Sequence, residues 1–133
     1  MTHTKEDYCS FAGRVLLSLL FLYGGLGKIV APAATMTYIA NAGLPFPVLA
    51  YAGSLLVELG FASALLLGYR TKLVAAGMAL FTLVTALVFH ANFAEKMQLI
   101  NFLKNIAICG GLLQVMAGSP GSLSLDAWRQ NRS

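Results

Sequence analysis

Residues 73–89 read LVAAGMALFTLVTALVF and contain no charged side chain, and the stretch continues through His90 to Phe93. A helix needs about 20 mostly apolar residues to cross a hydrocarbon core about 30 Å thick. The strands of membrane barrels are shorter, at about 10 residues, and alternate in polarity. We therefore expect a membrane-spanning helix over residues 73–93.

Three other segments have the same apolar character and are expected to span the membrane as helices. They cover residues 11–30, 46–68 and 99–118. Proline and glycine occur in the intervals between them, where helices should end. Because Lys28 interrupts the approach to the small residues that follow it, the first span is expected to be retained rather than cleaved as a signal peptide. The sequence predicts an all-α integral membrane four-helix bundle that forms a single membrane domain over residues 1–133.

The composition of the chain also indicates a membrane protein. The 133 residues are 58% hydrophobic and 11% charged, with a mean hydropathy of +0.74. Ordinary soluble domains are about 45–50% apolar and about 25% charged, and a short chain buries a small fraction of its surface. The net charge of +4 does not indicate nucleic-acid binding, because the nine Lys and Arg residues are scattered and form no basic stripe.

Lys and Arg residues are distributed unevenly between the two ends of the predicted bundle. One end, which includes both termini, holds six of them: Lys5, Arg14, Arg70, Lys72, Arg129 and Arg132. The opposite end holds the other three: Lys28, Lys96 and Lys104. Because the cytoplasmic side of a membrane protein carries the excess of Lys and Arg, we expect both termini to lie in the cytoplasm.

Ionisable side chains within membrane spans are costly, so they normally face the bundle interior and pair with one another. The predicted spans and their ends contain five: Arg14, Lys28, Glu58, His90 and Lys104. Glu58 is the single acid of this set and lies roughly 18 Å from the outer end of its predicted helix. An ionised carboxylate at this depth requires a cation beside it. We expect that cation to be Arg14 as the first choice and Lys104 as the second.

Two interpretations of these polar residues remain open. The first is a structural network within the membrane, made of Arg14, Glu58, Lys104 and Asn105. The second is a ligand-binding site open to the outer leaflet, made of Lys28, His90, Asn101 and Lys104. For His90 alone, an interfacial histidine at a helix end is the simpler interpretation.

The His and Cys content excludes several redox centres. A haem held by two histidines would need a partner for His90, but the only other histidine, His3, falls at the opposite end of the predicted bundle. Cys9 and Cys109 lie far apart in the sequence, so they form neither a disulfide relay nor a metal-binding pair. The ligands of a closed structural zinc site are also lacking. The sequence therefore predicts no metal site.

Seven short motifs follow one another between Gly13 and Leu113. They are Gly13-Arg14; Phe21 with Gly24-Gly25 and Lys28; Gly43-Leu44-Pro45; Glu58-Leu59-Gly60; Gly68-Tyr69-Arg70-Thr71; Phe89-His90; and Phe102-Leu103-Lys104-Asn105. Their order resembles the DoxX family of small bacterial membrane proteins. The resemblance implies a location in the bacterial cytoplasmic membrane and a link to quinone-dependent oxidation. Relatives often carry an oxidoreductase label, so the resemblance also implies an oxidoreductase subunit.

The residues and the resemblance together lead to three hypotheses. The leading one is an accessory membrane subunit that binds a quinone or another small apolar ligand through Lys28, Lys104 or His90, while partner redox proteins perform most of the chemistry. Cations suit a quinone because its reduction places negative charge on its oxygens. The alternatives are a small proton-coupled exporter that uses Glu58 and a purely structural scaffold. Self-association or binding to another membrane protein is also expected, because so small a bundle leaves many side chains facing lipid.

Overall fold

The computed structural model describes residues 2–133, and every regular element within that range is a helix. In chain order they are α1 (Lys5–Val30), α2 (Pro32–Asn41), α3 (Pro47–Leu55), the π-helix η1 (Leu56–Phe61), α4 (Ala62–Leu67), α5 (Thr71–Phe89), α6 (Lys96–Ala117) and α7 (Leu125–Gln130). Four helices among these residues are long and apolar enough to cross a membrane: α1, the continuous α3–η1–α4, α5 and α6. The predicted all-α architecture with four spans is confirmed.

The ends of the spans differ from the predicted bounds because local capping, rather than hydropathy, sets where a helix begins and ends. α1 begins at Lys5, well before the predicted residue 11, because Thr4 caps its first turn. The Thr4 hydroxyl accepts a hydrogen bond from the Asp7 backbone N–H, and the Asp7 carboxylate accepts one from the Thr4 backbone N–H. α5 ends at Phe89, so residues 90–93 belong to the turn that leads into α6.

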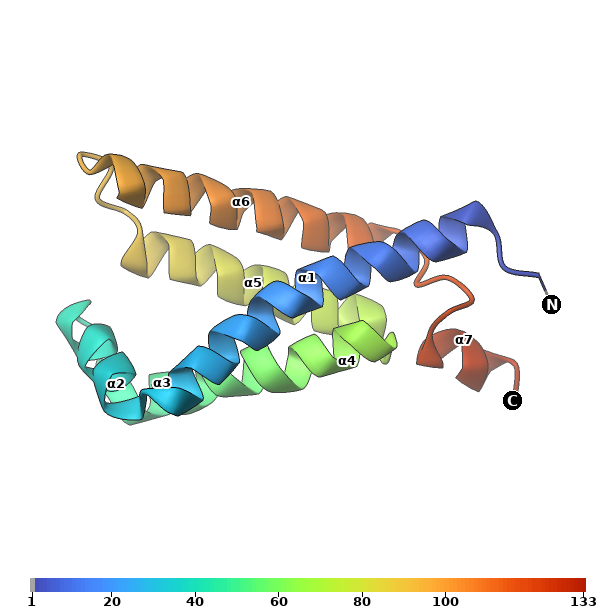
Figure 1. The fold of residues 1–133 in the computed structure, drawn as a ribbon, viewed down its shortest axis with the longest axis horizontal. Coiled ribbons are helices and arrows are strands. Elements are labelled where there is room, and N and C mark those ends of the chain that lie inside the picture. Colours follow the sequence, from blue (N-terminus) through green and yellow to red (C-terminus); the bar gives the residue numbers. More distant parts are fainter. Residues whose placement is uncertain (1) are drawn as a thin grey trace.

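The short helix α2 (Pro32–Asn41) lies in the interval between the first two predicted spans, where no helix was predicted. Proline occupies its first turn, where the missing N–H has no helical partner. After α2, Gly43 adopts a φ of 88°, which glycine tolerates without strain, and the chain turns into α3. In Figure 1, α2 lies at the end of the bundle opposite both termini.

The spans are arranged as two antiparallel pairs. α1 packs along η1 and α4, and α5 packs along α6 over most of their lengths. Both termini lie at one end of the bundle, and the turn between α5 and α6 lies at the other (Figure 1). Placement of both termini at one end is what an even number of spans requires. Which end faces the cytoplasm stays a prediction.

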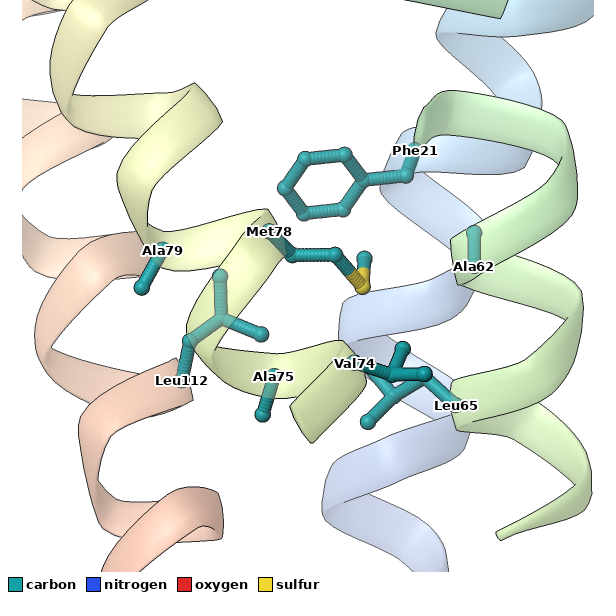
Figure 2. Close-up of a cluster of buried hydrophobic side chains, with 8 residues drawn as sticks. All are labelled: Phe21, Ala62, Leu65, Val74, Ala75, Met78, Ala79 and Leu112. Carbon is teal, nitrogen blue, oxygen red and sulfur yellow. The ribbon is translucent and has the colours of Figure 1, made fainter. Parts of the chain in front are cut away.

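The hydrophobic core lies where the four spans meet (Figure 2). It comprises Phe21 of α1, Ala62 and Leu65 of α4, Val74, Ala75, Met78 and Ala79 of α5, and Leu112 of α6. Small side chains in this set allow close helix packing, which drives helix association where lipid replaces water. Many large apolar side chains outside the core are exposed, as lipid-facing residues of a membrane bundle should be.

α1 and η1 are in close contact at Gly24 and Gly25. A Cβ atom on Gly25 would lie 2.7 Å from Leu59 Cδ2 and 3.1 Å from Glu58 Cβ. A Cβ atom on Gly24 would lie 3.3 Å from Glu58 Oε1. The absence of side chains at these two positions therefore allows η1 to lie directly against α1.

We expect Gly25→Ala to lower the free energy of unfolding by about 1–3 kcal/mol, because the added methyl group overlaps Leu59 and forces the helices apart. Gly27→Ala is the matched control, since a Cβ atom there meets nothing within 4 Å and the same helix gains the same propensity. The measurement is denaturant unfolding of both variants in detergent micelles. Equal stability of the two variants would contradict the close contact.

Candidate functional site

An ion pair joins α1 to η1 inside the bundle. Lys28 Nζ donates hydrogen bonds to both Glu58 carboxylate oxygens, each at 2.7 Å. The side chains of Lys28 and Glu58 are 28% and 10% exposed. No other salt bridge occurs among residues 2–133. This bidentate contact provides the compensation that a carboxylate within a membrane span requires.

The partner of Glu58 is thus Lys28, which corrects the expectation of Arg14 or Lys104. Antiparallel packing sets Arg14 against the carbonyls of Leu65 and Leu66 instead. At 1.5 Å per residue, this level of the helix lies roughly 10 Å from Glu58, so the guanidinium that binds there cannot also reach Glu58. Lys104 is exposed on α6.

Arg14 is fully buried and closes the end of the bundle that holds the termini. Its guanidinium donates to the Leu65 and Leu66 carbonyls at 3.1 and 3.0 Å, and to the Leu123 carbonyl at 2.5 Å. The last carbonyls of a helix lack partners within it, although the Leu65 carbonyl also accepts a hydrogen bond from the Gly68 backbone N–H at 3.1 Å. A cation at a helix C-terminus is also favoured by the helix dipole. Arg14 therefore connects α1, α4 and the C-terminal segment.

The predicted network of Arg14, Glu58, Lys104 and Asn105 is not assembled in one place. Glu58 and Asn105 do share a site, because both line a small cavity of about 200 Å³ between α1, η1, α5 and α6. Thr82 and Thr85 supply further hydroxyl groups to its lining. Arg14 and Lys104, both within the described part of the chain, line neither this cavity nor the larger one described below.

The backbone around Glu58 is a π-helix rather than an α-helix. η1 interrupts the second span over the six residues Leu56–Phe61, with Glu58 in its first turn and buried. π-Helical turns insert an extra residue per turn and are frequent at functional sites, because they change the direction of the side chains around them. No signal in the sequence predicted this segment.

A cavity of about 490 Å³ lies beside the ion pair, bounded by α1, α2, the continuous second span and α5. Its polar lining comes from Lys28, Thr35, Tyr38, Ser54, Glu58, Thr85 and His90. The remaining walls are apolar and come largely from Ile39, Leu44, Phe81, Val84, Val88 and Phe89. An apolar pocket with a few converging polar groups is the usual form of a small-molecule site.

α2 forms one wall of this cavity through an aromatic contact. The Tyr38 ring stacks on the Phe89 ring, with centroids 5.2 Å apart and planes 12° from parallel. His90 follows Phe89 and lies 3.2 Å, Nδ1 to Oε1, from Gln98 at the start of α6. Because no helix was predicted between the first two spans, sequence reasoning missed the contributions of Thr35 and Tyr38.

The structure divides the four predicted ligand-binding residues into two groups. Lys28 and His90 line the main cavity together. Asn101 and Lys104 are both described, and neither lines it. Ser54, which the sequence analysis did not include, lines the cavity from α3 and donates its hydroxyl to the Tyr51 carbonyl at 2.8 Å. Within residues 2–133, no three His, Cys, Asp or Glu side chains are grouped to hold a metal ion.

A match to a family model covers most of the elements that build this site. The DoxX family model matches residues 10–91, from α1 to the end of α5. The chain belongs to the DoxX family. This member is 39% identical over 121 residues to inner membrane protein YqjF of Escherichia coli (strain K12). The alignment covers 91% of this chain and 92% of YqjF.

A second relative of this DoxX-family chain is inner membrane protein YphA of the same organism. The identity is 32% over 118 residues, covering 85% of this chain and 84% of the relative. No solved structure matches the chain. Because both alignments extend over most of both chains, the similarity to these two relatives continues beyond residues 10–91.

In this DoxX-family chain, we expect Glu58→Ala to lower the free energy of unfolding by about 3 kcal/mol, because it leaves the Lys28 ammonium without its partner. Adding Lys28→Met should recover part of the loss. The double-mutant cycle should give a coupling energy between Lys28 and Glu58 of about 0.5–3 kcal/mol. Denaturant unfolding of the single and double variants in one detergent supplies the measurement.

Lys104→Met is the matched control for this cycle, since it removes an exposed lysine of α6 that does not contact Glu58. Its effect should add to that of Glu58→Ala without coupling. Coupling to Lys104 and none to Lys28 would show that the pair is assigned to the wrong lysine.

Proposed function

We propose that this chain is an accessory subunit of the bacterial inner membrane that binds a quinone or another small apolar carbonyl compound beside Lys28 and Glu58. Redox chemistry on the ligand would be performed largely by a partner protein. The observation that carries this proposal is the Lys28 ammonium, held by Glu58 at the edge of an otherwise largely apolar cavity of about 490 Å³. Cavities of about 300–1,000 Å³ are typical of small-molecule sites.

The Lys28–Glu58 pair supports recognition of a carbonyl oxygen. An ammonium group has three N–H donors, and Lys28 directs two of its hydrogen bonds to Glu58. The third remains for a ligand. As the ligand is reduced, negative charge grows on its oxygen, and a fixed ammonium nearby stabilises that charge. Glu58 balances the ammonium while the ligand is still neutral.

The aromatic wall of the cavity supports binding of a flat ring. The stacked pair of Tyr38 and Phe89 lies on one side, and aromatic rings favour stacked or edge contacts with a planar ligand. His90 supplies a second polar group at the cavity, so a ligand with two carbonyl oxygens has two candidate partners, Lys28 and His90.

A proton-coupled exporter is the second candidate, and one observation favours it. Glu58 lines both the main cavity and the small cavity toward Asn105, so one carboxylate borders two separate spaces. A carboxylate that exchanges a proton for a substrate needs access of this kind. Against this candidate, the bidentate contact with Lys28 opposes binding of a cationic substrate, which would have to displace the lysine.

The test uses the full chain in detergent, titrated with decylubiquinone and menadione. We expect the double variant Lys28→Met/Glu58→Gln to bind either quinone at least about tenfold more weakly, because a hydrogen bond from a charged donor contributes about 1.5–3 kcal/mol. Lys104→Met serves as the control and should bind as the unsubstituted chain does. Equilibrium dialysis gives the affinities, and mass spectrometry identifies any small molecule retained through purification.

Three results would redirect the proposal. Failure of the unsubstituted chain to bind either quinone would remove the quinone site. Export of a cation that depends on pH and is lost in Glu58→Gln would favour the exporter. Variants that change stability or assembly, and nothing else, would favour a structural scaffold.

We also propose that both termini face the cytoplasm, with support from the six Lys and Arg residues at the end of the bundle that holds the termini. Both relatives are named inner membrane proteins, which supports the same membrane for this chain. In intact cells, a membrane-impermeant maleimide should label Lys96→Cys in a Cys-free background and should not label Lys72→Cys. The reverse labelling would contradict this orientation.

A further inference from the structure

Another hollow, of about 720 Å³, lies at the end of the bundle that holds the termini, where α7 meets the turn between α4 and α5. Three cations line it: Arg70, Lys72 and Arg129. Its lining contains one acid, Asp126. The ion pair of Lys28 and Glu58 lies elsewhere in the bundle, so this hollow is independent of the proposed ligand cavity.

Asp126 forms no salt bridge with these cations within residues 2–133, although Arg129 lies close enough to act on its charge. Its carboxylate accepts hydrogen bonds from the backbone N–H groups of Arg70 and Thr71, each at 2.8 Å, and from the Thr71 hydroxyl at 2.7 Å. Burial raises the pKa of Asp126, but the hydrogen bonds from Thr71 and Arg70, together with the positive charge of Arg129, outweigh it and hold the pKa below its usual value. Asp126 is therefore ionised at neutral pH, with its oxygens directed to the start of α5.

The cations themselves have no salt-bridge partner within residues 2–133. The guanidinium carbons of Arg70 and Arg129 lie 5.8 and 5.4 Å from the centroid of the Tyr69 ring, so both arginines make cation–π contacts with the same ring. With Lys72 beside them, three basic side chains line a hollow whose lining has one acidic side chain, Asp126. Arginine side chains arranged in this way bind phosphate oxygens well, because each guanidinium offers parallel N–H donors.

An apolar stripe runs from this hollow along α5. Leu73, next to Lys72, lines the hollow and is 66% exposed. Leu80 and Leu87 follow at intervals of seven residues, which keeps them on nearly the same face of a helix, and they are 64% and 57% exposed. A basic site continuous with a lipid-facing apolar stripe fits an anion that carries acyl chains better than it fits a free anion.

We propose that this hollow binds the phosphate headgroup of an anionic phospholipid, and that its acyl chains lie along Leu73, Leu80 and Leu87. Basic clusters at the ends of membrane spans attract anionic lipids. The lipid would join α7 to the start of α5, at the same place where Asp126 already connects them. If both termini face the cytoplasm, the lipid belongs to the inner leaflet.

Trp128 provides a direct test in the unsubstituted chain, because it is the single tryptophan, lies in α7 and is 54% exposed. The full chain is placed in phosphatidylcholine vesicles that contain a small fraction of bromine-labelled phosphatidylglycerol. The same fraction of bromine-labelled phosphatidylcholine is the comparison. Phosphatidylglycerol should quench the Trp128 fluorescence at a several-fold lower fraction of labelled lipid. Equal quenching by the two lipids would overturn the proposal.

The variants Arg70→Gln, Lys72→Gln and Arg129→Gln should each reduce the preference for phosphatidylglycerol about fivefold, the effect expected from one basic residue near a membrane surface. Lys96→Gln, at the other end of the bundle, is the matched control and should leave the preference unchanged. An equal loss of the preference in Lys96→Gln would show that the preference depends only on net charge, and would contradict the proposed site. Loss of the preference in millimolar inorganic phosphate would assign the hollow to free phosphate and overturn the lipid assignment.

Discussion

An ionised carboxylate inside a membrane span requires a cation beside it, and the Lys28–Glu58 pair meets this requirement. The pair forms because Gly24 and Gly25 bring α1 against η1, so the lysine amine and both carboxylate oxygens lie within hydrogen-bond distance. The π-helical turn at Leu56–Phe61 contains Glu58, and both cavities of the bundle interior border it. Glu58 therefore takes part in the close contact between α1 and η1, in the π-helical turn and in the lining of both cavities.

Polar residues perform different tasks at the two ends of the bundle. At the end that holds the termini, polar side chains mainly bind backbone: the buried Arg14 binds the last carbonyls of α4 and Leu123, and the half-buried Asp126 binds the first N–H groups of α5. Backbone groups left without partners are costly in lipid, so such contacts stabilise the chain ends. Toward the other end, Lys28 and Glu58 bind each other and line the cavity of about 490 Å³, where a ligand could contact them.

The cavity depends on α2 as much as on the spans. The stacking of Tyr38 on Phe89 sets this short helix against the end of α5 and supplies a wall that four straight helices would lack. Without that wall, the Lys28–Glu58 pair would border open lipid rather than a defined cavity. A small apolar ligand would therefore contact both a charged pair and an aromatic wall, the two features that the proposed quinone site requires.

The sequence by itself determined the four spans, the all-helical fold and the need for Glu58 to have a cation, because each follows from local hydropathy or from the cost of burying a charge. Its motifs also indicated the DoxX family, which the family model confirms. Only the tertiary structure decided that Lys28 is the partner, that Arg14 binds carbonyls and that Lys104 is exposed. The physical reason is the register between helices. Helical spacing shows which residues share a face of one helix. The position of one antiparallel helix along another depends on the glycine contact, the π-helical turn and the caps, and a hydropathy pattern predicts none of these.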